Sequence, residues 1–263
     1  MEEFSVVFES MNASVQAALI AVGAMIFIVA LVSLAISALL GISYIRYNRQ
    51  ENSAHITGET AARRLLDANG LHNVDVKVTT SLIFGNNYSH HFKKVRLRRM
   101  SVGRESLAAL AMSGEKVALA VLDKENDPDM QHRNRVSPFI AIGPLTFLPL
   151  IIGGMVADYL LAGASGYVTL VLWILALLLY LFSFALSLTT LKTEKKAQRR
   201  AYSLLTESGM LTEAEKPELQ KLFRLYNIQY VNDVVLSLLE LAHLVIEGIA
   251  IFSGSGLEMT GNK

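Results

Sequence analysis

The chain of 263 residues carries 24 Lys and Arg against 23 Asp and Glu, so its formal charge of +1 is informative only once the charges are mapped. It contains no cysteine, which excludes disulfides and thiolate metal sites. Apolar residues make up 52% of the chain and form several long uncharged runs, which excludes an ordinary soluble enzyme and indicates a polytopic membrane protein.

The first predicted element is a transmembrane helix over residues 17–45. Residues 1–16 hold three Glu and no Lys or Arg, whereas Arg46 and Arg49 directly follow the apolar run. The run is too long for a cleaved signal peptide and its charged flank is on the wrong side, so we expect it to remain as an anchor. Residues 1–16 are then an extracytoplasmic tail.

Residues 46–137 are polar and predict a small α+β domain. Thr57 is expected to cap a helix that stops at Gly70. Alternating apolar residues predict two strands, one around Val76 and one around Val95, with a Gly-Asn-Asn turn region between them. These strands would form a small sheet packed on the helices.

Six basic residues cluster across the second predicted strand. They could bind anionic lipid headgroups, at about 1 kcal/mol for each residue near a membrane surface. They could equally be the charges that keep a solvated strand edge from aggregating. Nucleic acid is not expected as a partner, because no aromatic platform or reading motif accompanies the charge. The cluster consists of Lys93, Lys94, Arg96, Arg98, Arg99 and Arg104.

Two other motifs of this domain resemble metal sites only superficially. Adjacent residues on a strand point to opposite faces, so His90 and His91 are not expected to share a metal ion. Acidic residues alternate between Asp123 and Asp129, but this run contains Pro128 and lacks the Gly and the terminal Glu of a calcium loop. We interpret the run as a solvated connection to the next membrane segment.

Residues 138–162 and 167–190 are predicted as the second and third transmembrane helices, which form a helical hairpin. Pro144 and Pro149 predict a kink in the first of them, and the freed carbonyl groups must find partners in neighbouring helices. Residues 191–231 follow as a polar helical segment.

Residues 232–252 are the fourth predicted transmembrane helix, and residues 253–263 form the C-terminal tail. This helix differs from the others because ionisable side chains fall within about 80° of one another on one face. Each buried charge costs a few kcal/mol unless it is paired, so such residues indicate function by default. The stripe consists of Asp233, Glu240, His243 and Glu247.

Three interpretations of this stripe remain. Glu240 and His243 have the spacing of a carboxylate-bridged metal bundle, but other helices would have to supply carboxylates and the sequence offers only Asp158. A proton or ion path is the second. The third, which we favour, is a polar seam packed against another helix of this chain or of a partner, with His243 bonded to a carboxylate.

The helix predicted over residues 104–123 contains SLAAL followed by EKVALA. This sequence resembles the active-site helix of the YugP-type membrane zinc metallopeptidases, in which a Ser/Ala/Leu-rich turn runs into HEVGHA. In that comparison Glu115 replaces the first zinc His, Lys116 the general-base Glu and Leu119 the second zinc His. The motif needs two imidazoles for the metal and a carboxylate to take a proton from its water. Leucine binds no metal and a protonated lysine is no base, so this helix is expected to be chemically silent.

The resemblance extends beyond this helix and covers most of residues 55–250. Upstream, TGETAARRLLDANGLHNVDVKV is similar to the segment before the catalytic helix of the family. Downstream, TLKTEKKAQRRA is similar to TLPVEFDASRRA, whose Glu is the expected third zinc ligand. Glu194 keeps that position, whereas Lys192 and Lys196 replace the Pro and the Asp. The resemblance implies descent from a peptidase without its chemistry.

We therefore expect a mainly α, polytopic membrane protein with four transmembrane helices and a small α+β, zincin-like cytoplasmic domain. Every Lys and Arg except Lys263 lies between residues 46 and 224, which predicts that both termini lie outside the cytoplasm. We expect the membrane to be a bacterial inner membrane.

The expected function is that of an inactive metallopeptidase homologue, a scaffold or accessory subunit whose partners are other membrane protein subunits and membrane lipid, with no metal or other cofactor. The alternative is a membrane-bound metallopeptidase, or another metal-dependent enzyme, with a relocated site at Glu240 and His243.

Overall fold

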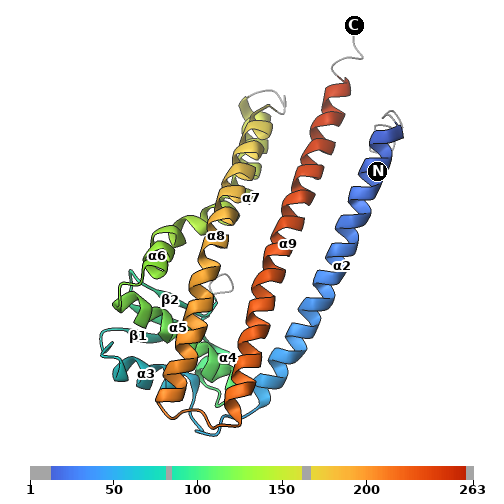
Figure 1. Ribbon diagram of the computed structural model, residues 1–263. Coiled ribbons are helices and arrows are strands. Elements are labelled where there is room, and N and C mark those ends of the chain that lie inside the picture. The colour runs from blue at the N-terminus through green and yellow to red at the C-terminus, as the bar shows by residue number, and fades with distance from the viewer. Residues whose placement is uncertain (1–12, 81–84, 162–166, 259–263) are drawn as a thin grey trace. The chain divides into compact units, whose positions relative to one another are not determined.

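The computed structural model describes residues 13–80, 85–161 and 167–258, and it is mainly helical with one small sheet (Figure 1). The helices are α2 (Ala13–Arg49), α3 (Gly58–Ala68), α4 (Arg99–Val102), α5 (Leu107–Lys124), α6 (Pro128–Ile140), α7 (Ile142–Leu161), α8 (Tyr167–Glu207) and α9 (Glu215–Glu258). The strands are β1 (Asp75–Thr79), β2 (Asn87–Ser89) and β3 (Lys94–Arg98).

Three helical stretches of the described residues are long and apolar enough to cross a membrane, and this makes the chain a membrane protein. They are Gly23–Arg49, Pro128–Leu160 and Tyr167–Glu207. Each has most of its apolar side chains outside the protein core, as lipid contact requires. They correspond to the first, second and third predicted membrane helices. The fourth lies within α9, where most side chains from Glu240 onward are outside the described part.

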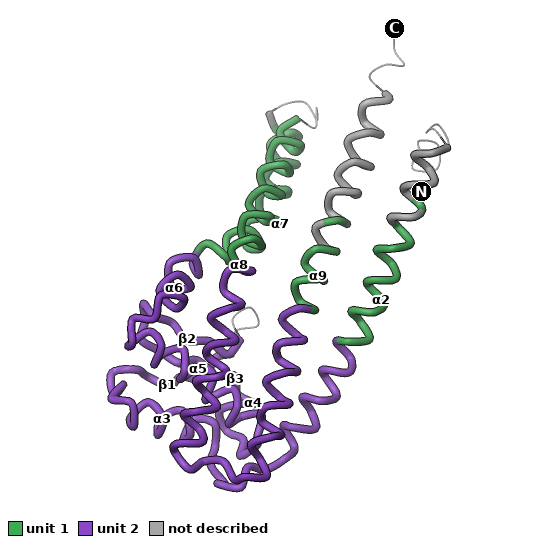
Figure 2. The backbone as a smooth tube through the Cα atoms, in the orientation of Figure 1, with its two compact units in different colours: residues 1–36, 139–186, 232–263 green, residues 37–138, 187–231 purple. Residues whose placement is uncertain are grey.

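The chain divides into two compact units, which Figure 2 shows in different colours. Unit 1 comprises residues 1–36, 139–186 and 232–263, and unit 2 comprises residues 37–138 and 187–231. Three long helices, α2, α8 and α9, each run from one unit into the other. The polar segments on either side of the predicted hairpin are therefore parts of one compact body.

The hairpin of unit 1 is joined by a serine hydroxyl at the place where the second membrane helix is interrupted. This interruption separates α6 from α7 and directly precedes Pro144, which has no backbone N–H to donate. Ser183 of α8 donates to the carbonyl of Phe139 at 3.0 Å and accepts from the N–H of Gly143 at 2.8 Å. Pro144 and Pro149 free the carbonyl groups of Ile140 and Leu145, so the Ser183 contacts join the two helices beside Pro144 without meeting the predicted need at the prolines.

Unit 2 is built around α5, which is buried along nearly its whole length. Most of the buried surface is apolar, as is typical of a helix with neighbours all round, and Glu115 and Lys116 are buried with it. Gly114 of α5 faces α8. A Cβ atom on Gly114 would be only 2.8 Å from Cδ1 of Leu205. A larger residue at this position would therefore displace the Leu205 side chain.

The sheet of unit 2 has the strand order β1-β3-β2, with β1 parallel and β2 antiparallel to β3. The strands around Val76 and Val95 are confirmed, as are the Thr57 cap and the stop at Gly70, where φ is +64°. Two expectations are wrong. The predicted turn region contains the start of β2, and β3 is the central strand, so its charges protect no sheet edge.

The acidic run after α5 is largely exposed, as predicted, but it is more ordered than a simple connection, because α6 begins within it and cations of α8 pair with it. Asp127 caps α6 by accepting from the backbone N–H groups of Asp129 and Met130. Cations spaced four residues apart on α8 then pair with the run. The pairs are Lys192–Asp129, Lys196–Asp127 and Arg200–Glu125. Two of these cations are departures from the family pattern, and both have new acidic partners.

Candidate functional site

Three of the four positions that the family resemblance singles out meet inside unit 2. Glu115 and Lys116 lie in the middle of α5, and Glu194 lies on α8. The ammonium nitrogen Nζ of Lys116 is 3.3 Å from Oε1 of Glu115 and 3.4 Å from Oε2 of Glu194. All three side chains are buried. The fold thus brings the positions of a metal site together but places a lysine ammonium between the two carboxylates.

Arg133 and Tyr230, which sequence reasoning missed, complete the group. Arg133 of α6 donates from Nε to Oε1 of Glu194 at 3.0 Å. Tyr230 of α9 donates its hydroxyl proton to Oε1 of Glu115 at 3.0 Å. We call these five side chains, contributed by four helices, the buried charge cluster. No motif marks either residue in the sequence, since the contacts arise only when α6 and α9 pack on α5 and α8.

The buried charge cluster is balanced, with two cations facing two carboxylates. Burial alone would lower the pKa of the Lys116 ammonium, but Glu115 and Glu194 outweigh it and hold that pKa well above its ordinary value. Burial raises the pKa of Glu115, and Lys116 and Tyr230 offset only part of the rise. Lys116 is therefore held in its protonated form, and Glu115 is the residue of the cluster whose charge is least well compensated. Oε2 of Glu115 is buried and has no hydrogen-bond partner among the described residues.

The residues of the buried charge cluster do not fit a zinc ion. Leu119, at the place of the second zinc His, is fully buried among apolar side chains. The Lys116 ammonium already occupies the space between the two carboxylates and repels a second cation. Among the described residues no group of three or more His, Cys, Asp or Glu side chains is placed to hold a metal ion. With Lys116 between the carboxylates and Leu119 in place of a ligand, the described side chains do not supply the donor set of a zinc site.

The carboxylate of Asp123, one residue before the end of α5, is the centre of a second group of hydrogen bonds. Oδ2 of Asp123 lies 2.7 Å from the Tyr88 hydroxyl, 2.7 Å from Nδ1 of His90 and 3.1 Å from Nζ of Lys93. Asn134 donates to the other oxygen at 2.8 Å. Burial raises the pKa of Asp123, but these donors outweigh it and hold the pKa below its ordinary value.

The contacts of Asp123 change the interpretation of two sequence features. His90 binds an aspartate, not a metal shared with His91, although the two rings touch edge to face with centroids 5.5 Å apart. Lys93, included in the predicted lipid-headgroup cluster, donates to the Asp123 carboxylate. The remaining basic residues of β3 and α4 keep no such partner in the core.

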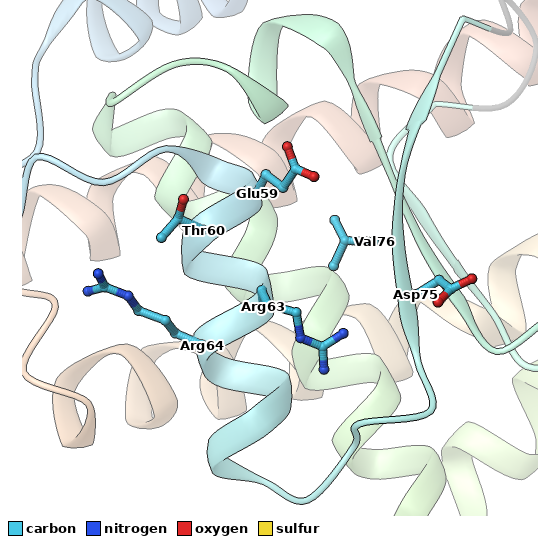
Figure 3. Close-up of a pocket in the computed structure, with 6 residues that line it drawn as sticks. All are labelled: Glu59, Thr60, Arg63, Arg64, Asp75 and Val76. Carbon is cyan, nitrogen blue, oxygen red and sulfur yellow. The ribbon is translucent and has the colours of Figure 1, made fainter.

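A surface pocket of about 430 Å³ lies between α3 and β1 (Figure 3). It is lined by Glu59, Thr60, Arg63, Arg64, Asp75 and Val76. Arg63 is bound internally, since its guanidinium contacts the carboxylate of Asp67 and the carbonyl oxygens of Leu71 and Val74. This pocket shares no residue with the buried charge cluster. The guanidinium of Arg63, which lines it, is already bound by the chain itself.

The predicted partner-contact stripe lies on α9, and only its first residue has a described side chain. Asp233 is exposed. The side chains of Glu240, His243 and Glu247 lie outside the described residues. Asp158, the candidate internal partner for the stripe, instead caps α8 by accepting from the backbone N–H groups of Val168 and Thr169 at 3.1 and 2.7 Å.

Helices α5 and α8 carry the segments on which the family resemblance rests, and the comparisons with known proteins support that resemblance. Residues 22–248 match the model of the family described as "Putative neutral zinc metallopeptidase". The chain belongs to this family of membrane metallopeptidase-like proteins, as the resemblance of its helices to the YugP type indicated.

One relative is the protein described as "Putative membrane protease YugP" from Bacillus subtilis. This chain is 26% identical to it over 205 residues, which cover 76% of this chain and 84% of the relative. No solved structure matches the chain.

Proposed function

We propose that this protein is a catalytically inactive member of its family that acts as a scaffold or accessory subunit of a membrane protein assembly. The observation that carries the proposal is the Lys116 ammonium between the carboxylates of Glu115 and Glu194. A cation fixed at this point repels a metal ion, and an amine whose pKa is raised accepts no proton from water. Leu119 removes a further ligand.

Metal analysis and peptidase assays on the detergent-purified protein test the loss of activity. We expect far less than one zinc per chain and no chelator-sensitive peptide hydrolysis. One tightly bound zinc whose removal abolishes hydrolysis would overturn the proposal. The same assay on His243→Ala then decides the alternative, because a relocated site at Glu240 and His243 would lose its metal in this variant.

The subunit role is supported by the polar stripe of the fourth predicted membrane helix. A face with four ionisable residues is costly to show to lipid, and Asp158 is already engaged by the first turn of α8. We expect Glu240→Leu to insert normally, because it makes the helix more apolar, but to weaken co-purification with the assembly. Ala242→Leu, on the opposite side of α9, is the matched control. Wild type that runs as a lone monomer in the mildest detergent, with no co-purifying protein, contradicts the proposal.

The proposal includes a bacterial inner membrane location, four membrane helices and both termini outside the cytoplasm, with unit 2 on the cytoplasmic side. Its support is the distribution of Lys and Arg, 23 of 24 of which lie in residues 46–224. A reporter that is active only in the cytoplasm should be silent when fused after Lys263. Strong activity there would require an odd number of membrane helices.

A further inference from the structure

One face of the small sheet is basic. The side chains of Lys77, Lys94, Arg96 and Arg98 share this face, because Lys77 pairs with Arg96 in the β1–β3 register and alternate residues of β3 point the same way. The intervening residues Val95 and Leu97 are fully buried on the other face. We call these four side chains the basic face. The nearest acidic side chain in the register is Asp75, opposite Lys94.

Exposed apolar side chains gather at the same sheet. Between residues 46 and 138 the described large hydrophobic side chains that are exposed are Val78, Phe92 and Met100, and all three lie in or next to the strands. Phe92 is 64% exposed, and the guanidinium carbon of Arg96 lies 5.4 Å from its ring centroid. Met100 is 51% exposed and follows Arg99. Elsewhere in this part of unit 2 the large apolar side chains that the structure describes are covered.

We propose that the basic face, with Phe92 beside it and Met100 on the helix that follows β3, binds the anionic headgroups of the membrane that holds the chain. Cations mixed with exposed aromatic and aliphatic side chains are typical of a surface that lies at the headgroup boundary. An acidic peptide would use the cations but would leave the isolated Phe92 and Met100 side chains in water.

Covalent tethering supports the same occupant. The candidate span in α2 ends at Arg49 and α3 begins at Gly58, so only a short connection joins this span to the helix that precedes β1. A tethered surface meets the membrane at a high effective concentration, and weak headgroup contacts are then sufficient. This inference does not depend on whether the peptidase site is active.

The absence of cysteine makes a direct test possible in the full chain. His91→Cys, exposed and next to Phe92, carries an environment-sensitive dye, and the protein is placed in nanodiscs of phosphatidylcholine with or without phosphatidylglycerol. Spin-labelled lipid should quench this dye more strongly when phosphatidylglycerol is present, and 0.5 M salt should reduce the difference. A dye at Ala68→Cys, at the exposed end of α3, is the control and should not be quenched.

The variant with Lys77→Ser, Arg96→Ser and Arg98→Ser decides the role of the basic face. Each cation near an anionic surface contributes about fivefold in binding, so quenching at position 91 should fall to the phosphatidylcholine level. Size-exclusion and thermal unfolding check that this variant is folded; if it is not, Arg96→Ser alone replaces it. Equal quenching in both lipids, unchanged quenching in the variant, or a dye that responds to poly-glutamate but not to lipid would each overturn the proposal.

Discussion

Nζ of Lys116 and Oε2 of Glu194 are 3.4 Å apart although 78 residues separate them in the chain. In a metallopeptidase the corresponding region holds a divalent cation, and its binding energy is part of the folding energy. Here the cation is covalently attached to α5 and cannot dissociate. The two carboxylates are therefore neutralised whenever the chain is folded, whatever the metal supply.

Lys116→Met should destabilise the protein by about 3–5 kcal/mol, because it leaves the buried carboxylate of Glu115 without a cation and that of Glu194 with Arg133 alone. Thermal or denaturant unfolding in detergent measures the change. Lys192→Met is the matched control, since Lys192 also pairs with a carboxylate but its side chain is 77% exposed, and it should change stability by at most about 1 kcal/mol. Equal effects of the two substitutions would show that the buried charge cluster carries no special share of the stability.

Tyr230→Phe should cost about 1–3 kcal/mol, because Glu115 then loses its phenol donor while Oε2 already has no described hydrogen-bond partner. In a Glu115→Gln background the same substitution should cost less, since no carboxylate remains to be stabilised. Tyr202→Phe, a half-buried tyrosine on α8, is the control, and a change within about 0.5 kcal/mol is expected. Additive effects of Tyr230→Phe and Glu115→Gln would contradict the contact.

Asp123→Asn should remove the contribution of Asp123 to the pH dependence of the unfolding free energy. The folded pKa of Asp123 lies below its ordinary value of 3.8, so the carboxylate stabilises the fold above pH 3.8 and this contribution is lost as the pH falls through the folded pKa. Wild type should exceed the variant in unfolding free energy at pH 6, and the gap should close below pH 3.8. A gap that stays constant from pH 6 to pH 2.5 would rule out this linkage.

The variant with Glu115→His, Lys116→Glu and Leu119→His should gain zinc affinity together with the retained Glu194. Zinc at 100 times its Kd should stabilise the variant by about 2.7 kcal/mol, whereas wild type should not respond. Arg133 still pairs with Glu194 and will weaken the site, so Arg133→Ala should tighten zinc binding further. The double variant that keeps Leu119 is the control. If the triple variant responds to zinc neither with Arg133 nor with Arg133→Ala, while both proteins remain folded, α5 and α8 are not placed as in a metal site.

Local signals in the sequence predicted much of the fold. The cap at Thr57, the helix stop at Gly70 and the strands around Val76 and Val95 all depend on neighbouring residues, and the structure has each of them. The short strand β2 could not be predicted in this way. Strand β2 has only three residues, and its Asn and Ser are poor strand formers, so its pairing with β3 decides its conformation.

The candidate site could be predicted only in part. The family motif aligned Glu115, Lys116 and Glu194, and the structure brings these three together. Periodicity does not say which helices meet, so Arg133 and Tyr230 could not be placed near them, and nor could the donors around Asp123. The acidic run after α5 shows the same limit, because its partners on α8 lie more than 60 residues away.

Tyr230 and Asp233 lie one turn apart on α9, a single unbroken helix from Glu215 to Glu258. The first contacts Glu115 in the core of unit 2, and the second opens the polar stripe. A helix transmits axial displacement along its length, and a slide of 1.5 Å, the rise of one residue, is enough to break a hydrogen bond of 3.0 Å. An axial displacement of α9 beyond Asp233 would therefore alter the hydrogen bond between Tyr230 and Glu115.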